Sequence, residues 1–290
     1  MRKINIPGKS GCYINIFEHD ERGTYFVRKS VNDFSYKERL KKQAEKQRLF
    51  REQNCSVIVT TPKILNSGEF QNEFYFDMEY FGSIDCITFL ETGCIADIEL
   101  LLEFLIAVIS ANIIESPLRE LDMGIFMAKY EDVRRQISAS PFVEESALRY
   151  GKIERMFNEI PPGEIPIGRC HGDLTLSNIL VKPVEKQFGV IDFLDCFIET
   201  PLQDMVKVRQ DTYYYWTPRF CRTSSDTRRL TAIFGYLDKR IDQFFNTFPY
   251  YAPYYAPFQA LNLLRILPYC DKMSISNLLV KDINKLVKDY

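Results

Sequence analysis

The chain has 290 residues, of which 46% are hydrophobic and 26% are charged, and its formal net charge is -2 at pH 7. This length exceeds the usual single domain, so two lobes around a cleft are expected. The near balance of acidic and basic residues speaks against a broad basic surface for nucleic acids or anionic membranes, and small molecules are the expected partners.

The cysteines and the apolar segments indicate the cellular setting. Eight cysteines are scattered along the chain without a Cys-x-x-Cys pair, which is typical of a reducing compartment. With two histidines and no cysteine cluster in the sequence, we do not expect a zinc site. The N-terminus lacks the apolar stretch of a signal peptide, and residues 100–114 are too short and too interrupted to span a bilayer. We therefore expect a soluble, cytoplasmic protein.

The first 82 residues show strand patterns around one helix. Predicted strands cover residues 3–6, 13–18, 24–30, 57–59 and 74–81, and a predicted helix covers residues 36–53. The first loop contains Gly8, Ser10 and Gly11, and glycines there let backbone N–H groups approach a phosphate. An ordinary hairpin turn explains the same residues. In the third strand, Arg28 and Lys29 point to opposite faces, so one of the two can face a cleft.

The remaining chain is dominated by helix patterns. Predicted helices cover residues 95–114, 145–158, 202–216, 226–248, 261–268 and 274–288. Aromatic residues concentrate in residues 213–216 and 248–258, where they either stack on an acceptor molecule or pack between helices. A strand-rich first part followed by a helical second part predicts an α+β fold.

The most informative segment is residues 171–193: a His-Gly-Asp triplet ending in Asp173, then Asn178, then Asp192 inside an Ile-Asp-Phe triplet. The apolar triplets that follow Asn178 and precede Asp192 are rich in β-branched residues and predict two short antiparallel strands. Both polar residues then lie at the same end of the hairpin, on strands about 4.8 Å apart. A carboxylate and an amide oxygen at one place are suitable ligands for Mg²⁺.

This segment resembles the aminoglycoside phosphotransferase and choline kinase-like family, whose mark is His-Gly-Asp-x-x-x-x-Asn followed by Ile-Asp-aromatic. The similarity continues through residues 201–205, which resemble the family's Pro-x-x-Asp-Leu segment. The resemblance implies a two-lobed protein kinase-like fold. A nucleotide-binding lobe would occupy residues 1–82, and a catalytic and acceptor-binding lobe would occupy residues 83–290. It also implies Mg²⁺-dependent transfer of the γ-phosphoryl group of ATP or GTP to a small-molecule hydroxyl.

The resemblance assigns roles to the residues of the motif. Asp173 would orient the acceptor hydroxyl and take its proton, while Asn178 and Asp192 would hold the metal. His171 would brace the loop through hydrogen bonds, and Asp204 would have a structural role.

The resemblance further implies a cation in the first lobe that contacts the α- and β-phosphates. Of the two candidates, Lys29 is favoured over Arg28. A helix glutamate should pair with this cation and be followed one turn later by an inward-facing apolar residue. Glu45 with Leu49 fits that pattern, and Glu38 is the weaker alternative.

Two further segments of the first lobe resemble nucleotide-binding elements of the family. Glu79 to Phe81 resembles the hinge, which receives the nucleotide base through backbone groups. Ser10 and Gly11 lie where the phosphate-covering loop is expected. A plain buried strand and a plain turn remain the alternatives for these two segments.

The chain departs from the family after Asp192. Many relatives carry an acidic residue and then glycines there, whereas this chain has Leu194, Phe197 and Glu199. The acceptor therefore cannot be copied from a relative; a sugar, an amino alcohol or an aminoglycoside is expected, with a sugar-like acceptor favoured. A catalytically silent kinase-like module that binds a nucleotide is the alternative function. A protein kinase is a weaker one, because no Ala-Pro-Glu activation element follows the motif.

Overall fold

The computed structural model describes residues 3–6, 12–19, 24–53, 56–70, 73–220 and 226–290. The chain divides into two compact units. Unit 1 comprises Met1–Ala107 and Ser177–Asp195, and unit 2 comprises Val108–Leu176 and Cys196–Tyr290. The segment from Asn178 to Asp192 thus belongs to unit 1, although the residues on both sides of it in the chain belong to unit 2. The functional lobe boundary at residue 82 stays a prediction.

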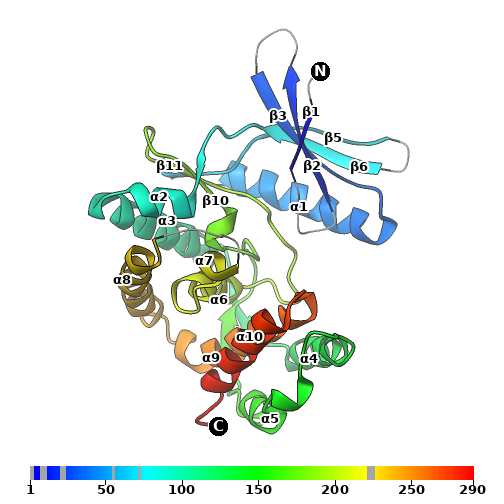
Figure 1. The fold of residues 1–290 in the computed structure, drawn as a ribbon, viewed down its shortest axis with the longest axis vertical. Coiled ribbons are helices and arrows are strands. Elements are labelled where there is room, and N and C mark those ends of the chain that lie inside the picture. Colours follow the sequence, from blue (N-terminus) through cyan, green and yellow to red (C-terminus); the bar gives the residue numbers. More distant parts are fainter. Residues whose placement is uncertain (1–2, 7–11, 20–23, 54–55, 71–72, 221–225) are drawn as a thin grey trace. The chain divides into compact units, whose positions relative to one another are not determined.

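Unit 1 contains a five-stranded antiparallel sheet with the strand order β1-β2-β3-β6-β5 (Figure 1). The strands are β1 Lys3–Ile6, β2 Tyr13–His19, β3 Thr24–Val31, β5 Ile64–Phe70 and β6 Glu73–Glu79. In β6, Phe74, Phe76 and Met78 alternate and are all buried. The side-chain period of two places them on one face of the sheet, which becomes the core face.

The helix α1, Phe34–Gln53, covers this core face (Figure 1). Leu40 and Ala44 pack with the buried side chains of β3 and β6. Gln47 continues the same helical stripe and donates a hydrogen bond to the Pro62 carbonyl, with an N···O distance of 2.7 Å. The spacing of three to four residues puts these positions on one side of the helix, so that α1 is fixed in rotation against the sheet.

A second, four-stranded sheet in unit 1 carries the motif hairpin, with the order β4-β11-β10-β7. Its strands are β4 Val59–Thr60, β7 Ile84–Asp85, β10 Ile179–Lys182 and β11 Gln187–Val190. In the antiparallel pair β10 and β11, Ile179 lies opposite Val190. The hairpin predicted from the two apolar triplets is therefore confirmed.

Aromatic side chains of two helices pack against this hairpin. Phe188 of β11 contacts Phe89 of α2, Cys86–Thr92, and Phe104 of α3, Ile95–Ile114, with ring centroids 5.6 and 4.8 Å away. Next in the strand, Gly189 has no room for a side chain, because an added Cβ would lie 2.9 Å from the Phe81 ring. Aromatic pairs of this kind contribute about 0.5–1.5 kcal/mol beyond the area that they bury.

Unit 2 is mostly helical. Its helices are α4 Met123–Ser138, α5 Tyr150–Asn158, α6 Pro201–Thr212, α7 Trp216–Phe220, α8 Thr227–Phe245, α9 Tyr251–Leu264 and α10 Met273–Leu286. One small antiparallel pair is formed by β8 Leu118–Glu120 and β9 Glu164–Pro166. In the described part of the chain, every helix is too short or too polar to cross a membrane.

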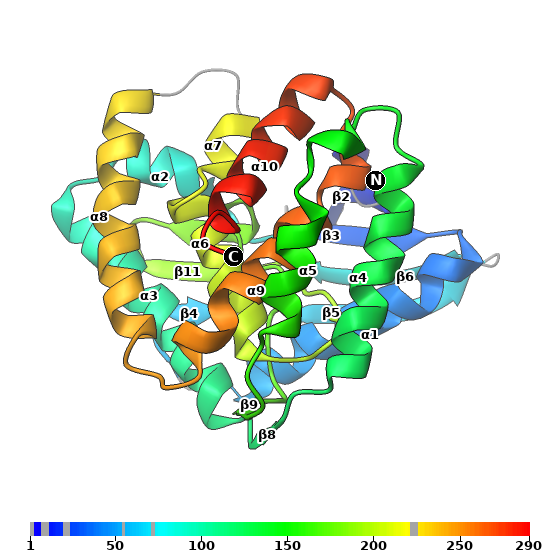
Figure 2. The ribbon, with the colours of Figure 1, turned by 90° about the horizontal axis from the view of Figure 1, so that it is seen from below.

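The helix α6 is the centre of unit 2 and contacts α7, α8 and α9 (Figure 2). Thr200 caps its first turn by accepting a hydrogen bond from Leu202 N, and Pro201 occupies a first-turn position where its missing N–H costs nothing. Every residue of α6 except Lys207 is buried. A helix with so little exposed surface positions its polar side chains rigidly.

The predicted α+β fold, with an antiparallel first part and a helical second part, is confirmed. The helix predicted over residues 202–216 was too long, because α6 ends at Thr212 and Tyr215 has a positive φ of 57°. The helix predicted over residues 261–268 was wrong at both ends, since α9 already begins at Tyr251. Pro257 lies inside α9, although a proline in a helix interior is unfavourable. Strand β5 and helix α4 were missed.

Candidate active site

In unit 1, Lys29 and Asp192 form an ion pair in which the lysine is buried and the aspartate is partly exposed. Lys29 Nζ lies 3.0 Å from Asp192 Oδ1 and 2.9 Å from Gln43 Oε1. The Lys29 side chain is 2% exposed, whereas the Asp192 side chain is 33% exposed. Arg28, the preceding residue of β3, instead makes a two-pronged pair with Asp77, at 2.7 and 2.8 Å. Strand alternation therefore separates the two cations, and Lys29 is the one beside Asp192.

The charge of Asp192 decides the protonation of Lys29. Burial by itself lowers the pKa of Lys29, but the negative charge and the hydrogen bond of Asp192 outweigh burial and raise this pKa above its ordinary value. Lys29 is consequently a charged ammonium at neutral pH, in a place that is shielded from water.

The helix partner predicted for Lys29 was wrong. Glu45 is exposed and Leu49 is 45% exposed, so neither faces the sheet. Gln43, which is 2% exposed, contacts Lys29 instead. Side chains two positions apart in an α-helix differ by about 200° in direction, so Gln43 and Glu45 cannot point to the same side. Leu40, three positions before Gln43, is an apolar residue on the same side of the helix, and it was the signal that could have identified this side as the buried one.

The backbone conformation determines where the two predicted metal ligands, Asn178 and Asp192, lie. Asn178 ends a single 3-10 turn directly before β10, and Asp192 follows β11 by two residues. Ile191 N donates to Asn178 O at 3.0 Å, which ties the two ends of the hairpin together. Asp192 has a φ of 62°, in the left-handed region that non-glycine residues rarely adopt. Such a conformation is kept at sites where the direction of a side chain matters.

The remaining predicted nucleotide residues have local partners in unit 1. Glu79 N donates to Lys63 O at 2.9 Å, and Lys63 N donates to the Glu79 carboxylate at 3.0 Å. Phe81 is buried, and Lys182 lies over its ring at 4.3 Å. Whether these residues receive a base stays a prediction. Ser10 and Gly11 lie outside the described residues.

In unit 2, the loop that carries Asp173 is held by Asp204 of α6. His171 N and Gly172 N donate to the two carboxylate oxygens of Asp204, each at 2.8 Å, and Asn112 Nδ2 donates at 2.9 Å. Asp204 is completely buried. Gly172 has a φ of 90°, which favours glycine here. These three hydrogen bonds explain a structural role for Asp204 and fix the backbone just before Asp173.

Asp173 itself faces a cation of α6, the helix that also carries Asp204. Lys207 Nζ lies 3.0 Å from Asp173 Oδ1, and the Asp173 side chain is 26% exposed. Asp173 N donates to His171 Nδ1 at 3.2 Å, so the completely buried His171 braces the loop from inside. The carboxylate thus has a defined direction and access to solvent.

A second carboxylate of α6 holds the far end of the loop. Asp211 accepts hydrogen bonds from Leu176 N and Thr217 N at 2.6 and 2.7 Å. Burial raises the pKa of Asp211 to about 6. From the sequence, Asp211 is either an acceptor-facing carboxylate or a structural anchor, and these hydrogen bonds make it an anchor. The sequence interpretation missed Lys207, although its i+3 spacing from Asp204 marks one helix face directed at the motif loop.

The two groups of aromatic residues noted in the sequence, at 213–216 and 248–258, meet around Arg209, and their main role is packing. The Arg209 guanidinium lies over the rings of Tyr213 and Tyr255, and it donates to Tyr251 Oη at 3.0 Å. Asp238 completes the arrangement by accepting two hydrogen bonds from Arg209 at 3.0 and 3.1 Å. A small cavity of about 260 Å³ remains beside Tyr213 and Tyr255.

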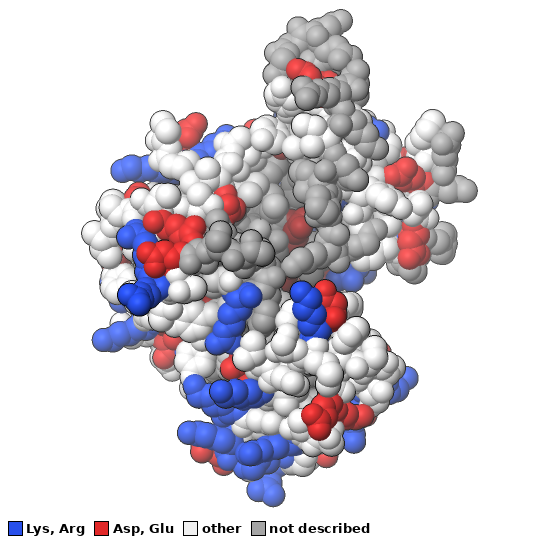
Figure 3. Space-filling view, in the orientation of Figure 1, with Lys and Arg blue, Asp and Glu red and all other residues white. Residues whose placement is uncertain are grey.

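Basic side chains gather toward the end of unit 2 where the chain terminates (Figure 3). There Arg149, Lys281, Lys285 and Lys288 are among the residues that line an open cavity of about 580 Å³. Elsewhere on the face shown, basic and acidic side chains are mixed (Figure 3).

Comparisons with known proteins agree with this geometry. A family model described as "Phosphotransferase enzyme family" matches residues 13–240. Curated proteins give no match. A thermostable mutant of aminoglycoside phosphotransferase APH(4)-Ia has a similar structure over 100% of this chain and 94% of that one, with a TM-score of 0.63 and 13% identity.

Two other solved structures belong to the same group of similar folds. Ethanolamine kinase from Plasmodium vivax matches 98% of this chain and 81% of its own, with a TM-score of 0.58 and 11% identity. Macrolide 2'-phosphotransferase type I matches 99% of this chain and 91% of its own, with a TM-score of 0.56 and 13% identity. The predicted two-lobed protein kinase-like fold is therefore confirmed. Because the family model also covers well over half of the chain, from β2 to α8, the chain belongs to the phosphotransferase enzyme family.

Proposed function

We propose that this protein transfers the γ-phosphoryl group of ATP or GTP to a hydroxyl group of a small molecule, in a Mg²⁺-dependent reaction. The observation that carries the proposal is the Lys29–Asp192 pair, in which a buried ammonium lies beside a partly exposed carboxylate of unusual backbone conformation. The family match across residues 13–240 supports the same reaction class.

The donor atoms of the hairpin fit a magnesium ion. Asn178 and Asp192 offer an amide oxygen and a carboxylate, which are the hard ligands that Mg²⁺ prefers. Asp192 is partly exposed and therefore open to an incoming ligand. When bound, the metal would supply charge neutralisation on the phosphate oxygens.

Lys29 would contact the phosphates of the nucleotide. Its ammonium is already desolvated and already charged, so little reorganisation accompanies the contact. Gln43 holds the ammonium from the side of α1 without adding a negative charge that would compete with phosphate. Asn178, Asp192 and Lys29 all belong to unit 1. We keep residues 1–82 as the nucleotide-binding lobe, with Glu79, Phe81, Ser10 and Gly11 as its further candidates.

Asp173 would orient the acceptor hydroxyl and accept its proton. Lys207 fixes the direction of the Asp173 carboxylate, whose side chain is 26% exposed and therefore accessible to an acceptor. Because the transition state of phosphoryl transfer is loose, positioning should contribute more than strong base catalysis. Only residues 174–177 separate Asp173 from Asn178 in the chain, which ties the catalytic residue covalently to the metal hairpin.

A sugar-like compound, an amino alcohol or an aminoglycoside is the proposed acceptor. Solved structures of similar fold include a ternary complex of an aminoglycoside phosphotransferase with AMP-PNP and hygromycin B, and an ethanolamine kinase. The scattered thiols favour a cytoplasmic location.

The test is a panel of hydroxyl compounds, incubated with ATP or GTP and Mg²⁺, in which phosphorylated product is detected by mass spectrometry. Asp192→Ala and Asp173→Ala should each abolish turnover of any acceptor found. Asp289→Ala, at an exposed carboxylate near the C-terminus, is the matched control and should keep full activity. Unchanged turnover in Asp192→Ala would refute the metal assignment. Nucleotide binding without turnover of any compound would favour the silent module.

A further inference from the structure

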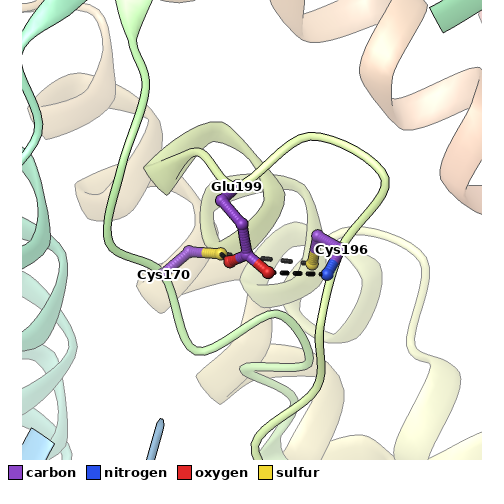
Figure 4. A group of neighbouring side chains, drawn as sticks. All are labelled: Cys170, Cys196 and Glu199. Carbon is purple, nitrogen blue, oxygen red and sulfur yellow. Dashed lines mark hydrogen bonds between the residues drawn. The ribbon is translucent and has the colours of Figure 1, made fainter. Parts of the chain in front are cut away.

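Three side chains from two segments that are distant in the sequence meet beside the His-Gly-Asp loop of unit 2 (Figure 4). Cys170 directly precedes His171, whereas Cys196 and Glu199 lie in the segment that leads into α6. The sulfur atoms of Cys170 and Cys196 are 4.0 Å apart. Cys170 Sγ donates to Glu199 Oε2 at 2.9 Å, and Cys196 N donates to Glu199 Oε1 at 2.8 Å.

The distance of 4.0 Å between the two sulfur atoms is close to that in a small coordination shell. With Zn–S bonds of about 2.3 Å, two sulfurs on one tetrahedral zinc ion lie about 3.8 Å apart, and a sulfur and a carboxylate oxygen lie about 3.5 Å apart. The ligand atoms of Cys170, Cys196 and Glu199 all lie within 4.8 Å of one another. Side-chain rotations that lengthen the Cys170–Glu199 contact from 2.9 Å would complete the shell.

Burial and access also suit a bound ion. Cys170 is 3% exposed, so one ligand is shielded from water. Cys196 and Glu199 are half-buried and leave a path for an ion from solution. The sequence shows no cysteine cluster because 25 residues separate Cys170 from Cys196, and the folded chain brings their sulfur atoms to 4.0 Å.

We propose that Cys170, Cys196 and Glu199 bind one thiophilic divalent cation such as Zn²⁺. A solvent molecule would be the fourth ligand. Two thiolates and a carboxylate select such an ion over Mg²⁺, which prefers oxygen ligands alone. On binding, the two thiol protons pass to solvent, and the metal replaces the hydrogen bond between Cys170 and Glu199. This proposal is independent of the proposed phosphotransferase reaction.

The site would cross-link two parts of unit 2 that hydrogen bonds already connect. Gly168 N donates to Glu199 O at 2.7 Å, and Cys196 Sγ approaches Gly172 O at 3.8 Å. A metal would thus clamp the residue directly before the His-Gly-Asp triplet to the segment that leads into α6. Because the folded protein binds the ion and the unfolded chain lacks the site, Zn²⁺ should raise the unfolding temperature.

The experiment uses the full chain, reduced and stripped of metal with a chelator. Zn²⁺ is titrated against a chromogenic chelator, and Co²⁺ is used as an optical substitute whose thiolate charge-transfer absorption reports sulfur ligands. The expected result is one ion per chain with this absorption. Cys170→Ser and Cys196→Ser should weaken binding by more than about 100-fold, since even residues outside the coordination shell change affinity by about 10- to 100-fold.

The controls separate the site from thiols in general. Cys94→Ser removes an exposed cysteine of unit 1 and should leave affinity, stoichiometry and absorption unchanged. Glu199→Gln should weaken Zn²⁺ binding and keep the thiolate absorption of Co²⁺. If the serine variants do not fold, as judged by circular dichroism, the Co²⁺ absorption of the unaltered chain still decides the matter.

Two outcomes would overturn the proposal. One is a reduced protein that takes up no Zn²⁺ and shows no thiolate absorption with Co²⁺, including the case in which air oxidation then yields a Cys170–Cys196 disulfide in peptide maps. The other is a folded Cys170→Ser or Cys196→Ser variant that binds as tightly as the unaltered chain.

Discussion

Replacing the two neighbouring cations of β3 should separate nucleotide binding from stability. Lys29→Met removes the ammonium beside Asp192, and Arg28→Met removes the guanidinium that pairs with Asp77 on the opposite face. Both variants place the same apolar side chain one residue apart on the same strand. Each is therefore the matched control of the other.

For Lys29→Met, two effects on stability oppose each other. The ammonium is 2% exposed, and an apolar side chain of similar length avoids a desolvation penalty of several kcal/mol. Against this, Gln43 Oε1 loses its hydrogen bond, which costs about 1–3 kcal/mol in a buried place. Asp192 is one-third exposed and can be hydrated. The free energy of unfolding should change by less than about 2 kcal/mol.

The same variant should bind nucleotide much more weakly. A charge-assisted hydrogen bond to phosphate contributes about 1.5–3 kcal/mol, which corresponds to about a 10- to 150-fold weaker affinity for ATP with Mg²⁺. Arg28→Met should do the reverse. It leaves Asp77, whose side chain is 9% exposed, without its cation, and should lower the free energy of unfolding by about 2–3 kcal/mol with unchanged nucleotide affinity.

Urea unfolding and calorimetric titration with ATP and Mg²⁺ measure the two quantities in the same preparations. The reasoning is refuted if Arg28→Met loses nucleotide affinity while Lys29→Met keeps it. Equal losses of affinity in both variants would also refute it, because strand alternation would then not select the cation.

Three other substitutions test the surroundings of the motif. Gln43→Leu should lower kcat/KM by about 5- to 10-fold, because one net hydrogen bond contributes about 1 kcal/mol. Glu45→Gln, at an exposed position, should leave kcat/KM unchanged. The opposite ranking in steady-state kinetics would restore Glu45 as the partner of Lys29. Asp204→Asn turns one acceptor of three buried hydrogen bonds into a donor, so urea unfolding should show a loss of about 2–4 kcal/mol, and an unaltered midpoint would contradict the anchoring role. The pKa of Asp211 is raised to about 6 in the folded chain, so its contribution to stability is present below the unfolded pKa near 4 and is lost as pH rises through 6, by on the order of 3 kcal/mol. Asp211→Asn should remove this fall from a series of urea titrations between pH 4 and 7, and parallel curves for both proteins would disprove the raised pKa.

The β10–β11 hairpin could be predicted because it is local. Ile179 and Val190 belong to short β-branched runs on either side of a polar loop, and neighbouring runs of this kind pair with few alternatives. The same holds for β3, whose alternation already separated Arg28 from Lys29. Local periodicity reports that two residues face opposite ways, but it does not report which side becomes the core.

Helix α1 shows where local information ends. Glu45 with Leu49 fits the expected pattern of a glutamate and an apolar residue four positions later, whereas Gln43 with Gln47 does not. The sheet against which the helix packs chose the second pair, because Leu40 and Ala44 on that side fill the space beside β6. The rotation of this helix depends on its partner surface, and within the helix Leu40 was the signal of the buried side.

The sequence by itself determined the elements of the motif: a His-Gly-Asp loop, a hairpin with Asn178 and Asp192 at one end, and a cation in the third strand. Tertiary structure alone decided the partners of these residues. It brought Gln43 to Lys29 across 14 positions of sequence, Lys207 to Asp173 across 34, and Cys196 to Cys170 across 26. The physical reason is that hydrogen bonds and ion pairs depend on distances of about 3 Å, and for residues so far apart in the chain these distances are set only when the helices and sheets pack.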